Sequence, residues 1–320
     1  MGWIFWSLIM VVGITFYAIF SKNIVKSFTP ELLNFFGFLA LVFVSLAIVL
    51  IKYGRSFVKL HWFPLVTGLF LGVSLLFLVY SILYSHNPGI PIAGFRIEMV
   101  LVAILSVFIY KTPLPIHKLL FMLLMIGGVV LITFFPKKKQ IKEQLFILKP
   151  DEEEDPEDDT EDDKSDKSKK TSEKKYLIYL SISIVAATIT ILMQKHFDNI
   201  KGIIPWTANF NMYIGATIIA FVFYFIFKKY KNIKKQFQSL REKKSQYSFP
   251  IVMVSFILWL IGLPLAILPA PNPGFVNAIC TLSIPATLFL SPLFIKESGI
   301  SVLQIFGAII IVLSAMVISI

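Results

Sequence analysis

Two ionisable residues, Arg96 and Glu98, lie inside an apolar stretch of the sequence. Residues 88–110 contain no other Asp, Glu, Lys or Arg. A planar guanidinium binds a carboxylate or a phosphate through two parallel hydrogen bonds, whereas a buried ionisable group without a partner is costly. We therefore interpret both residues as candidates for substrate binding. The alternative is a structural role, in which these residues form a buried hydrogen-bond network with neighbouring side chains or with backbone carbonyls.

The spacing of this pair makes a geometric prediction. If a helix begins near Pro88, Arg96 lies about 12 Å along it, close to the middle of the apolar stretch. Two positions on a helix differ by roughly 200° of rotation. We therefore expect Arg96 and Glu98 to point in different directions, one towards a cavity and the other towards a neighbouring helix.

Uncharged polar residues in other apolar stretches add further candidates for substrate binding: Asn209, Asn211, Asn277 and Thr281. The alternative for each is a hydrogen bond between helices, which is common for Ser, Thr and Asn in bilayers. Asn277 and Thr281 are four positions apart and would share one helix face. Pro285 follows them and would free a backbone carbonyl that could line a cavity.

The sequence gives no support to an enzyme. His61, His86, His117 and His196 fall near the ends of apolar stretches without the spacing of metal ligands, and Cys280 is the only cysteine. No Gly-rich phosphate loop is followed by Lys and Ser or Thr, and no nucleophile lies near a base in a known signature. We therefore predict no catalytic residue, no cofactor and no metal site.

The composition indicates a membrane protein. The 320 residues are 57% hydrophobic and only 15% charged, whereas soluble domains have about a quarter of their residues charged. The net charge of +11 could suggest nucleic-acid binding, but most of the basic residues lie in short stretches between apolar runs. We therefore predict an integral, multi-pass membrane protein whose partner is the lipid bilayer and not a nucleic acid.

About 20 apolar residues are needed for one helix to cross a bilayer. Ten stretches of that kind predict an all-α protein with transmembrane helices at 3–21, 32–51, 62–84, 88–110, 117–136, 176–195, 206–227, 249–268, 274–295 and 300–320. A soluble protein of buried helices is excluded, because these runs leave no polar face for water.

One segment, residues 137–175, differs from the rest in composition. Fourteen of the 19 acidic residues lie between Glu143 and Glu173, followed by a block rich in Lys and Ser. Such a segment buries too little apolar surface to offset its conformational entropy, so we expect disorder. We interpret it as a linker, and a docking or phosphorylation segment is the alternative. It separates residues 1–136 from residues 176–320.

These two parts contain an internal repeat. The segments 86–89 (HNPG) and 271–274 (PNPG) each precede two apolar spans and align at a displacement of 185 without a gap. Each half has five predicted spans, and an odd number requires that the second half enters the membrane from the opposite side. The prediction is therefore two inverted five-helix repeats, a plan that recurs in secondary transporters with a site between the halves.

The sequence resembles the drug/metabolite transporter superfamily, of the EamA-like transporter family. The resemblance rests on the five-plus-five spans, the Asn-Pro-Gly entries, and a Glu, a Gln and a Gly at Glu297, Gln304 and Gly307. The first half departs from this pattern, with Thr112, Leu119 and Met122 at the matching positions. The resemblance implies a central cavity lined by spans one, three, four, six, eight and nine, with spans five and ten peripheral. It also makes Glu297, Gln304 and Gly307 candidates for structural or gating roles, and Pro285 is a further candidate because of the carbonyl that it would free.

The function predicted from the sequence is secondary transport of a small polar metabolite by alternating access. A coupling proton and a counter-substrate are candidate further partners. The alternatives are a nucleotide-sugar or sugar-phosphate exchanger of the same superfamily, which Arg96 could serve, and a polytopic membrane scaffold that does not transport. The loops on the side of the insert hold 22 basic residues and those on the other side hold 7. The positive-inside rule therefore predicts that the insert is cytoplasmic and both termini are outside or lumenal.

Overall fold

The computed structural model describes residues 2–24, 28–84, 94–134, 161–197, 203–227, 238, 243–294 and 300–320, and every regular element in these residues is a helix. The first part contains α1 (Gly2–Ile24), α2 (Pro30–Lys52), a 3-10 turn η1 (Arg55–Phe57), α3 (Trp62–Tyr84), α5 (Ile97–Tyr110) and α6 (Ile116–Phe134). The second part contains α8 (Glu161–Lys195), α9 (Pro205–Ile226), α11 (Lys243–Ile267), α12 (Pro273–Cys280), α13 (Ser283–Phe294) and α14 (Val302–Ser319).

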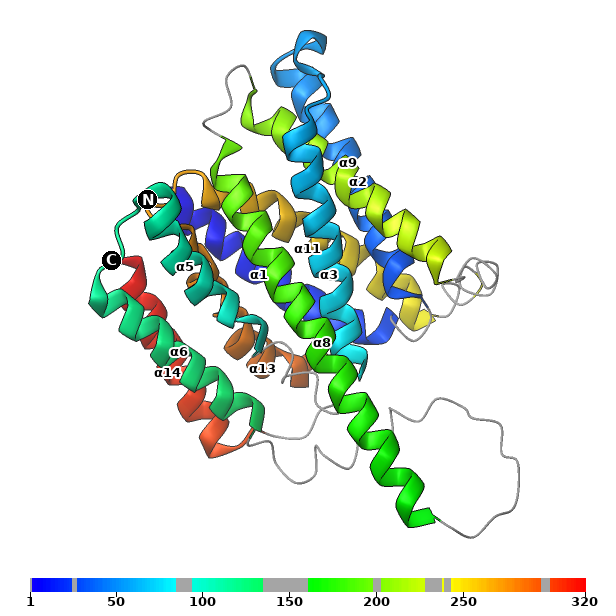
Figure 1. Ribbon diagram of the computed structural model, residues 1–320, viewed down its shortest axis with the longest axis vertical. Coiled ribbons are helices and arrows are strands. Elements are labelled where there is room, and N and C mark those ends of the chain that lie inside the picture. The colour runs from blue at the N-terminus through cyan, green and yellow to red at the C-terminus, as the bar shows by residue number, and fades with distance from the viewer. Residues whose placement is uncertain are drawn as a thin grey trace.

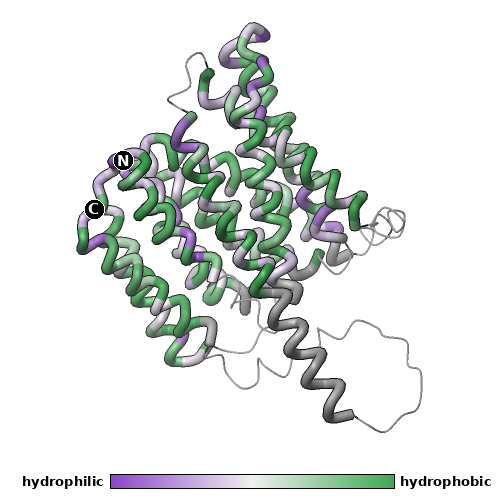
Figure 2. Tube along the Cα trace, in the orientation of Figure 1, coloured by the Kyte–Doolittle hydropathy of each residue, from purple (hydrophilic) through white to green (hydrophobic). Residues whose placement is uncertain are grey.

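The helices are those of an integral, multi-pass membrane protein. Eight helical segments in the described residues are long and apolar enough to cross a bilayer, and they match eight of the predicted spans. The fourth and fifth predicted spans correspond to shorter apolar helices, Ile97–Tyr110 and Ile116–Ile132. Apolar residues run along the helices (Figure 2), and large side chains such as Phe108 and Leu293 are exposed on the outer surface, where lipid would solvate them.

The bundle is built mainly from pairs that join the two parts of the chain. α1 packs on α11, α3 packs on α8 and α9, α2 packs on α9, and α5 packs on α12. α6 and α14 lie side by side at one edge of the molecule, and both termini lie at the same end of the bundle in this view (Figure 1). Spans five and ten are thus peripheral, as the family resemblance implied.

Glycines allow α3 and α9 to approach closely. A Cβ at Gly68 would overlap the carbonyl of Met212, and a Cβ at Gly215 would overlap the carbonyl of Leu65. A Cβ at Gly72 would overlap the side chain of Ile219. These small residues let the two backbones come into direct contact. Such close packing is a main cause of helix association in a bilayer, where lipid is as apolar as the side chains.

The structure differs from the predicted disorder at the end of the charged segment. α8 begins at Glu161, so residues 161–175 continue the sixth span as one 35-residue helix. The disorder predicted for residues 137–160 lies outside the described residues.

Candidate functional site

The fourth predicted span is interrupted at Arg96. Residues 94–95 are helical, Arg96 lies in a turn with φ −68° and ψ −9°, and α5 begins at Ile97. The N–H of Met99 donates to the carbonyl of Arg96 at 3.2 Å, which is a bond to the third preceding residue and not to the fourth. The chain therefore changes its helical phase between the segment that carries Arg96 and the helix that carries Glu98.

The ninth predicted span is interrupted at the corresponding place. α12 ends at Cys280 and α13 begins at Ser283, so Thr281 lies in the break. The displacement of 185 that relates the two halves of the sequence aligns Arg96 with Thr281. Interrupted apolar helices at corresponding positions of two repeats indicate a binding site in transporters.

Pro285 lies in the first turn of α13, where a helix has no internal acceptor for the N–H that proline lacks. The carbonyl that Pro285 was expected to free is that of Thr281, and it accepts from the N–H of Ile284 at 3.0 Å. Pro285 thus suits the start of α13, and it is not among the residues that line the cavity described next.

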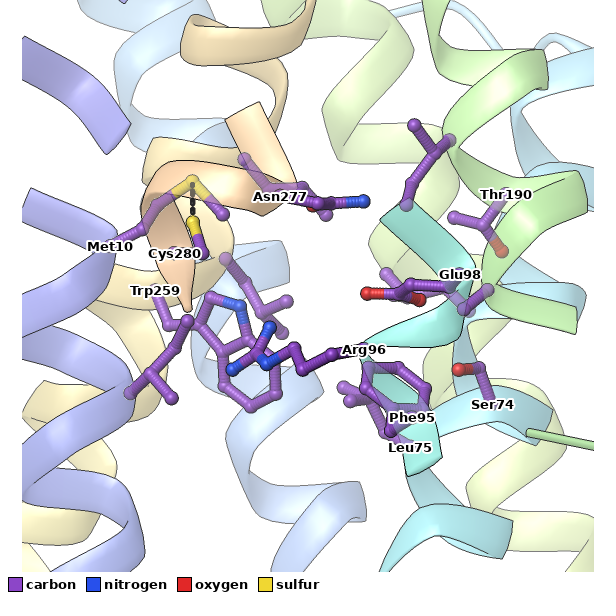
Figure 3. A pocket seen from close by; sticks show the side chains of 16 residues that line it. Met10, Ser74, Leu75, Phe95, Arg96, Glu98, Thr190, Trp259, Asn277 and Cys280 are labelled. Atoms are coloured by element: carbon purple, nitrogen blue, oxygen red, sulfur yellow. Dashed lines mark hydrogen bonds between the residues drawn. The ribbon is translucent and has the colours of Figure 1, made fainter. Parts of the chain in front are cut away.

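A small cavity lies between the two interrupted spans (Figure 3). The volume in which the centre of a water molecule can lie is about 40 Å³, so the cavity has room for a few waters. Its walls come from α1, α3, the turn at Arg96 with α5, α8, α11 and α12. These elements belong to spans one, three, four, six, eight and nine, the same six that the family resemblance implied.

Arg96 and Glu98 both line this cavity. Their side chains are 5% and 3% exposed, and Figure 3 shows Arg96 reaching towards Trp259 while the carboxylate of Glu98 points into the space below Asn277. Nη2 of Arg96 donates to Oγ of Ser283 at 3.2 Å, whereas Nε of Arg96 and Oε2 of Glu98 have no hydrogen-bond partner. The two side chains point in different directions, as the spacing predicted, but the expectation that only one of them faces a cavity is wrong, because both line the same one.

Asn277 also lines the cavity, and its Nδ2 has no hydrogen-bond partner. Thr281, which was expected to share a helix face with Asn277, is buried but is not part of the lining. Its hydroxyl donates to the carbonyl of Asn277 at 3.1 Å and lies 3.7 Å from Sδ of Met99. Asn277 is therefore available to a ligand, whereas Thr281 joins the interrupted span to α5.

The cavity lining also includes Ser74, Thr190 and Trp259. Ser74 on α3 donates from Oγ to the carbonyl of Ser183 at 3.1 Å, and Ser183 returns a bond to the carbonyl of Ser74 at 2.8 Å. Thr190 on α8 donates to the carbonyl of Ala186 at 2.8 Å. Trp259 on α11 forms part of the wall. An aromatic residue in an apolar helix gives no sequence signal, because most such residues face lipid or the core.

Asn209 and Asn211 lie outside the cavity lining. Oδ1 of Asn211 accepts from the N–H of His61 at 3.0 Å, and its Nδ2 donates to the carbonyl of Lys59 at 2.8 Å and to that of Thr207 at 2.7 Å. Asn211 therefore holds the connection between α2 and α3 against α9. Asn209 is 1% exposed, and neither of its amide atoms has a hydrogen-bond partner.

The C-terminal candidates lie at the contact of α6 and α14. Gln304 accepts from the N–H of Ser301 at 2.9 Å in a capping box, and its Nε2 donates to the carbonyl of Ile132 at 3.1 Å. A Cβ at Gly307 would lie 2.6 Å from the carbonyl oxygen of Gly128, so Gly307 allows the two helices to touch. Both residues support the peripheral pair, and Glu297 lies outside the described residues.

Among the residues that the structure describes, no group of three His, Cys, Asp or Glu side chains could hold a metal ion. Cys280 is buried, and its Sγ lies 3.9 Å from Sδ of Met10 in the cavity wall. The described cavity offers a guanidinium, a carboxyl group and an amide that each have an atom without a hydrogen-bond partner, set among mainly apolar side chains.

Comparisons with other proteins agree with this architecture. A solved structure titled "Crystal structure of protein" shares 14% identity with the chain and superimposes with a TM-score of 0.61, covering 98% of each chain, which supports the fold alone. No curated protein matches the sequence. The EamA-like transporter family matches residues 1–134, although the Glu, Gln and Gly motif that suggested this family lies in the second half. Residues 1–134 are thus similar to the EamA-like transporter family, in agreement with the resemblance of the sequence.

Proposed function

We propose that the protein is a secondary transporter that moves a small polar metabolite across a membrane by alternating access. The observation that carries the proposal is the cavity between the two interrupted spans, with Arg96 and Glu98 buried in its wall. Charged groups inside a membrane protein generally mark the path of a substrate or an ion, because burying them without a function is costly. The family matched by residues 1–134 is one of transporters.

We further propose that residues 1–136 and 176–320 are inverted repeats joined by residues 137–175, and the helix packing supports this. If the halves are exchanged, the contact of α1 with α11 corresponds to the contact of α8 with α3, and both contacts are extensive. Three other pairs, α2 with α9, α5 with α12 and α6 with α14, join each helix to its own counterpart. A two-fold axis in the membrane plane would produce both kinds of pairing.

The cavity is closed towards the side on which both termini lie, which we call the terminal side. Nδ2 of Asn272 donates to the carbonyl of Ala103 and to Oγ1 of Thr112, both at 3.1 Å. A Cβ at Gly274 would lie 2.5 Å from Cβ of Ala103, so α12 and α5 are in direct contact there. Lys195 extends the seal by donating to the carbonyls of Leu268 and Ala270 at the end of α11. Alternating access requires this contact to open.

A nucleotide-sugar or sugar-phosphate exchanger is the second candidate, and the guanidinium of Arg96 favours it because it suits a phosphate. The carboxylate of Glu98 in the same cavity opposes it, because it would repel the charge of the phosphate. Transport of a metabolite that is not strongly anionic therefore fits both residues better.

The test is flux into proteoliposomes that contain the purified chain. We expect uptake above that of protein-free liposomes for some members of a panel of amino acids, nucleobases, nucleotide sugars and sugar phosphates, with and without a proton gradient. Arg96→Gln and Glu98→Gln should each strongly reduce this flux, while Lys52→Gln, a charge removal at the exposed end of α2, should leave it unchanged. Absence of flux for the whole panel, with protein that remains monodisperse and folded, would contradict transport.

A further inference from the structure

Two groups of opposite formal charge, the guanidinium of Arg96 and the carboxyl group of Glu98, line the cavity without a direct ion pair between them. Arg96 and Glu98 are each at least nine-tenths buried, and no ion pair joins these two described residues. Nε of Arg96 is left without an acceptor and Oε2 of Glu98 is left without a donor. Buried polar groups are normally hydrogen-bonded, so a ligand or ordered water is expected to complete both groups.

From this arrangement we propose that the cavity selects a dipolar molecule, with its anionic group at Arg96 and its cationic group at Glu98. The proposal rests on the transport function above and names the class of its substrate. A carboxylate on the molecule would accept from Nε of Arg96, and an ammonium group would donate to Oε2 of Glu98. Each buried atom without a partner then gains a charge-assisted hydrogen bond.

Molecules of a single charge fit this cavity less well. An anion bound at Arg96 would leave Glu98 as an uncompensated carboxylate in surroundings of low polarity, and a cation at Glu98 would leave Arg96 uncompensated. A dipolar molecule satisfies both groups and adds no net charge to the interior. Selection therefore arises from repulsion of the wrong charge as well as from attraction of the right one.

The rest of the wall indicates the remainder of the molecule. Apolar surface comes from four different elements, through Met10, Leu75, Phe95, Leu260 and Leu263. Nδ2 of Asn277 supplies one further donor, suited to a second carboxylate oxygen or to a carbonyl. The present space holds only a few waters, so a molecule with an apolar side group enters only when the bundle opens.

The experiment measures ligand binding to the purified full chain in detergent, by thermal stabilisation and by calorimetry. The probes are matched sets: glycine, leucine and phenylalanine, each beside its amide, which keeps only the cation, and its N-acetyl derivative, which keeps only the anion. For at least one set we expect the dipolar compound to bind about tenfold or more tightly than both derivatives, which is about 1.4 kcal/mol.

Variants then separate the two ends of the molecule. Arg96→Gln should remove the advantage of the dipolar compound over its amide, and Glu98→Gln should remove its advantage over the N-acetyl derivative. Arg96→Lys and Glu98→Asp keep the charges and should retain part of the preference for the dipolar compound. If they do, the loss of preference in the two Gln variants is caused by loss of the charge and not by unfolding. Lys52→Gln should keep the wild-type order.

The proposal is overturned if no dipolar compound binds better than both of its derivatives, or if the two Gln variants weaken all three compounds of a set alike. Because binding is measured without a membrane, the outcome is independent of flux. Selective binding without flux would contradict transport and support the dipolar site, and flux with no such selectivity would do the reverse.

Discussion

Arg96 donates a hydrogen bond from Nη2 to Oγ of Ser283 at 3.2 Å, although 187 residues separate them in the chain. The bond joins the interruption before α5 to the first residue of α13, beyond the interruption of the ninth span. These are the two places in the described bundle where a break lies beside the cavity. The orientation of the guanidinium therefore depends on the position of the second half of the protein.

This relationship makes Ser283 a residue that positions Arg96. We predict that Ser283→Ala lowers flux of the transported metabolite by about tenfold, because a hydrogen bond to a charged group contributes roughly 1.5–3 kcal/mol. The measurement is initial uptake into proteoliposomes over a range of substrate concentrations. Ser314→Ala is the matched control, since Ser314 is equally buried and its hydroxyl has no partner. Equal effects of the two variants would argue against a positioning role for Ser283.

Closure of the terminal side should depend on the absence of a side chain at Gly274. In Gly274→Ala the new methyl would meet Cβ of Ala103 at 2.5 Å and the carbonyl of Met99 at 2.7 Å, so α12 and α5 cannot stay in contact. We predict that Cys280, which is 1% exposed in the cavity wall, reacts faster with a membrane-impermeant maleimide applied from the terminal side.

The control for this experiment is Gly127→Ala, because a Cβ at Gly127 has nothing within 4 Å. It should leave the reactivity of Cys280 at the wild-type rate. If Gly274→Ala also leaves this rate unchanged in folded protein, the contact of α12 with α5 does not close the terminal side.

The contact of α3 with α9 should be necessary for stability. Gly68→Ala places a methyl group against the backbone of Met212, which cannot move aside as a flexible side chain could. Overpacking of this kind destabilises proteins by about 1–3 kcal/mol, so we expect a lower melting temperature in detergent. Gly127→Ala serves again as the comparison, and identical melting of the two variants would show that α3 and α9 tolerate a wider separation.

The orientation predicted from basic residues can be tested at Ser56, which is exposed in η1 on the terminal side. In a Cys280→Ser background, Ser56→Cys should react with an impermeant maleimide applied to the outside of intact cells, or from the lumen if the protein resides in an internal membrane. Labelling only after the cytoplasmic side is exposed would reverse the assignment of both termini and of the insert.

Hydrophobicity along the chain determined the helices because crossing a bilayer depends on a local property, the length of an apolar run. The same argument drew attention to Arg96 and Glu98, since a charge within such a run is conspicuous whatever the fold. Gly68 and Gly72, four positions apart in the sequence, form a pattern of small residues that permits close helix approach in any bundle, because neither position carries a side chain. These features needed no knowledge of which helices are neighbours.

The tertiary structure decided which polar residues share the cavity. Asn211 and Asn277 have the same chemistry and similar apolar surroundings in sequence, yet the first holds a connecting segment through three hydrogen bonds and the second lines the cavity. The shared cavity of Arg96 and Glu98 likewise depends on an interruption that a continuous helical count does not include. Rotation and neighbours of a helix are set by contacts distant in sequence, and for this reason the site could only be resolved by the packed structure.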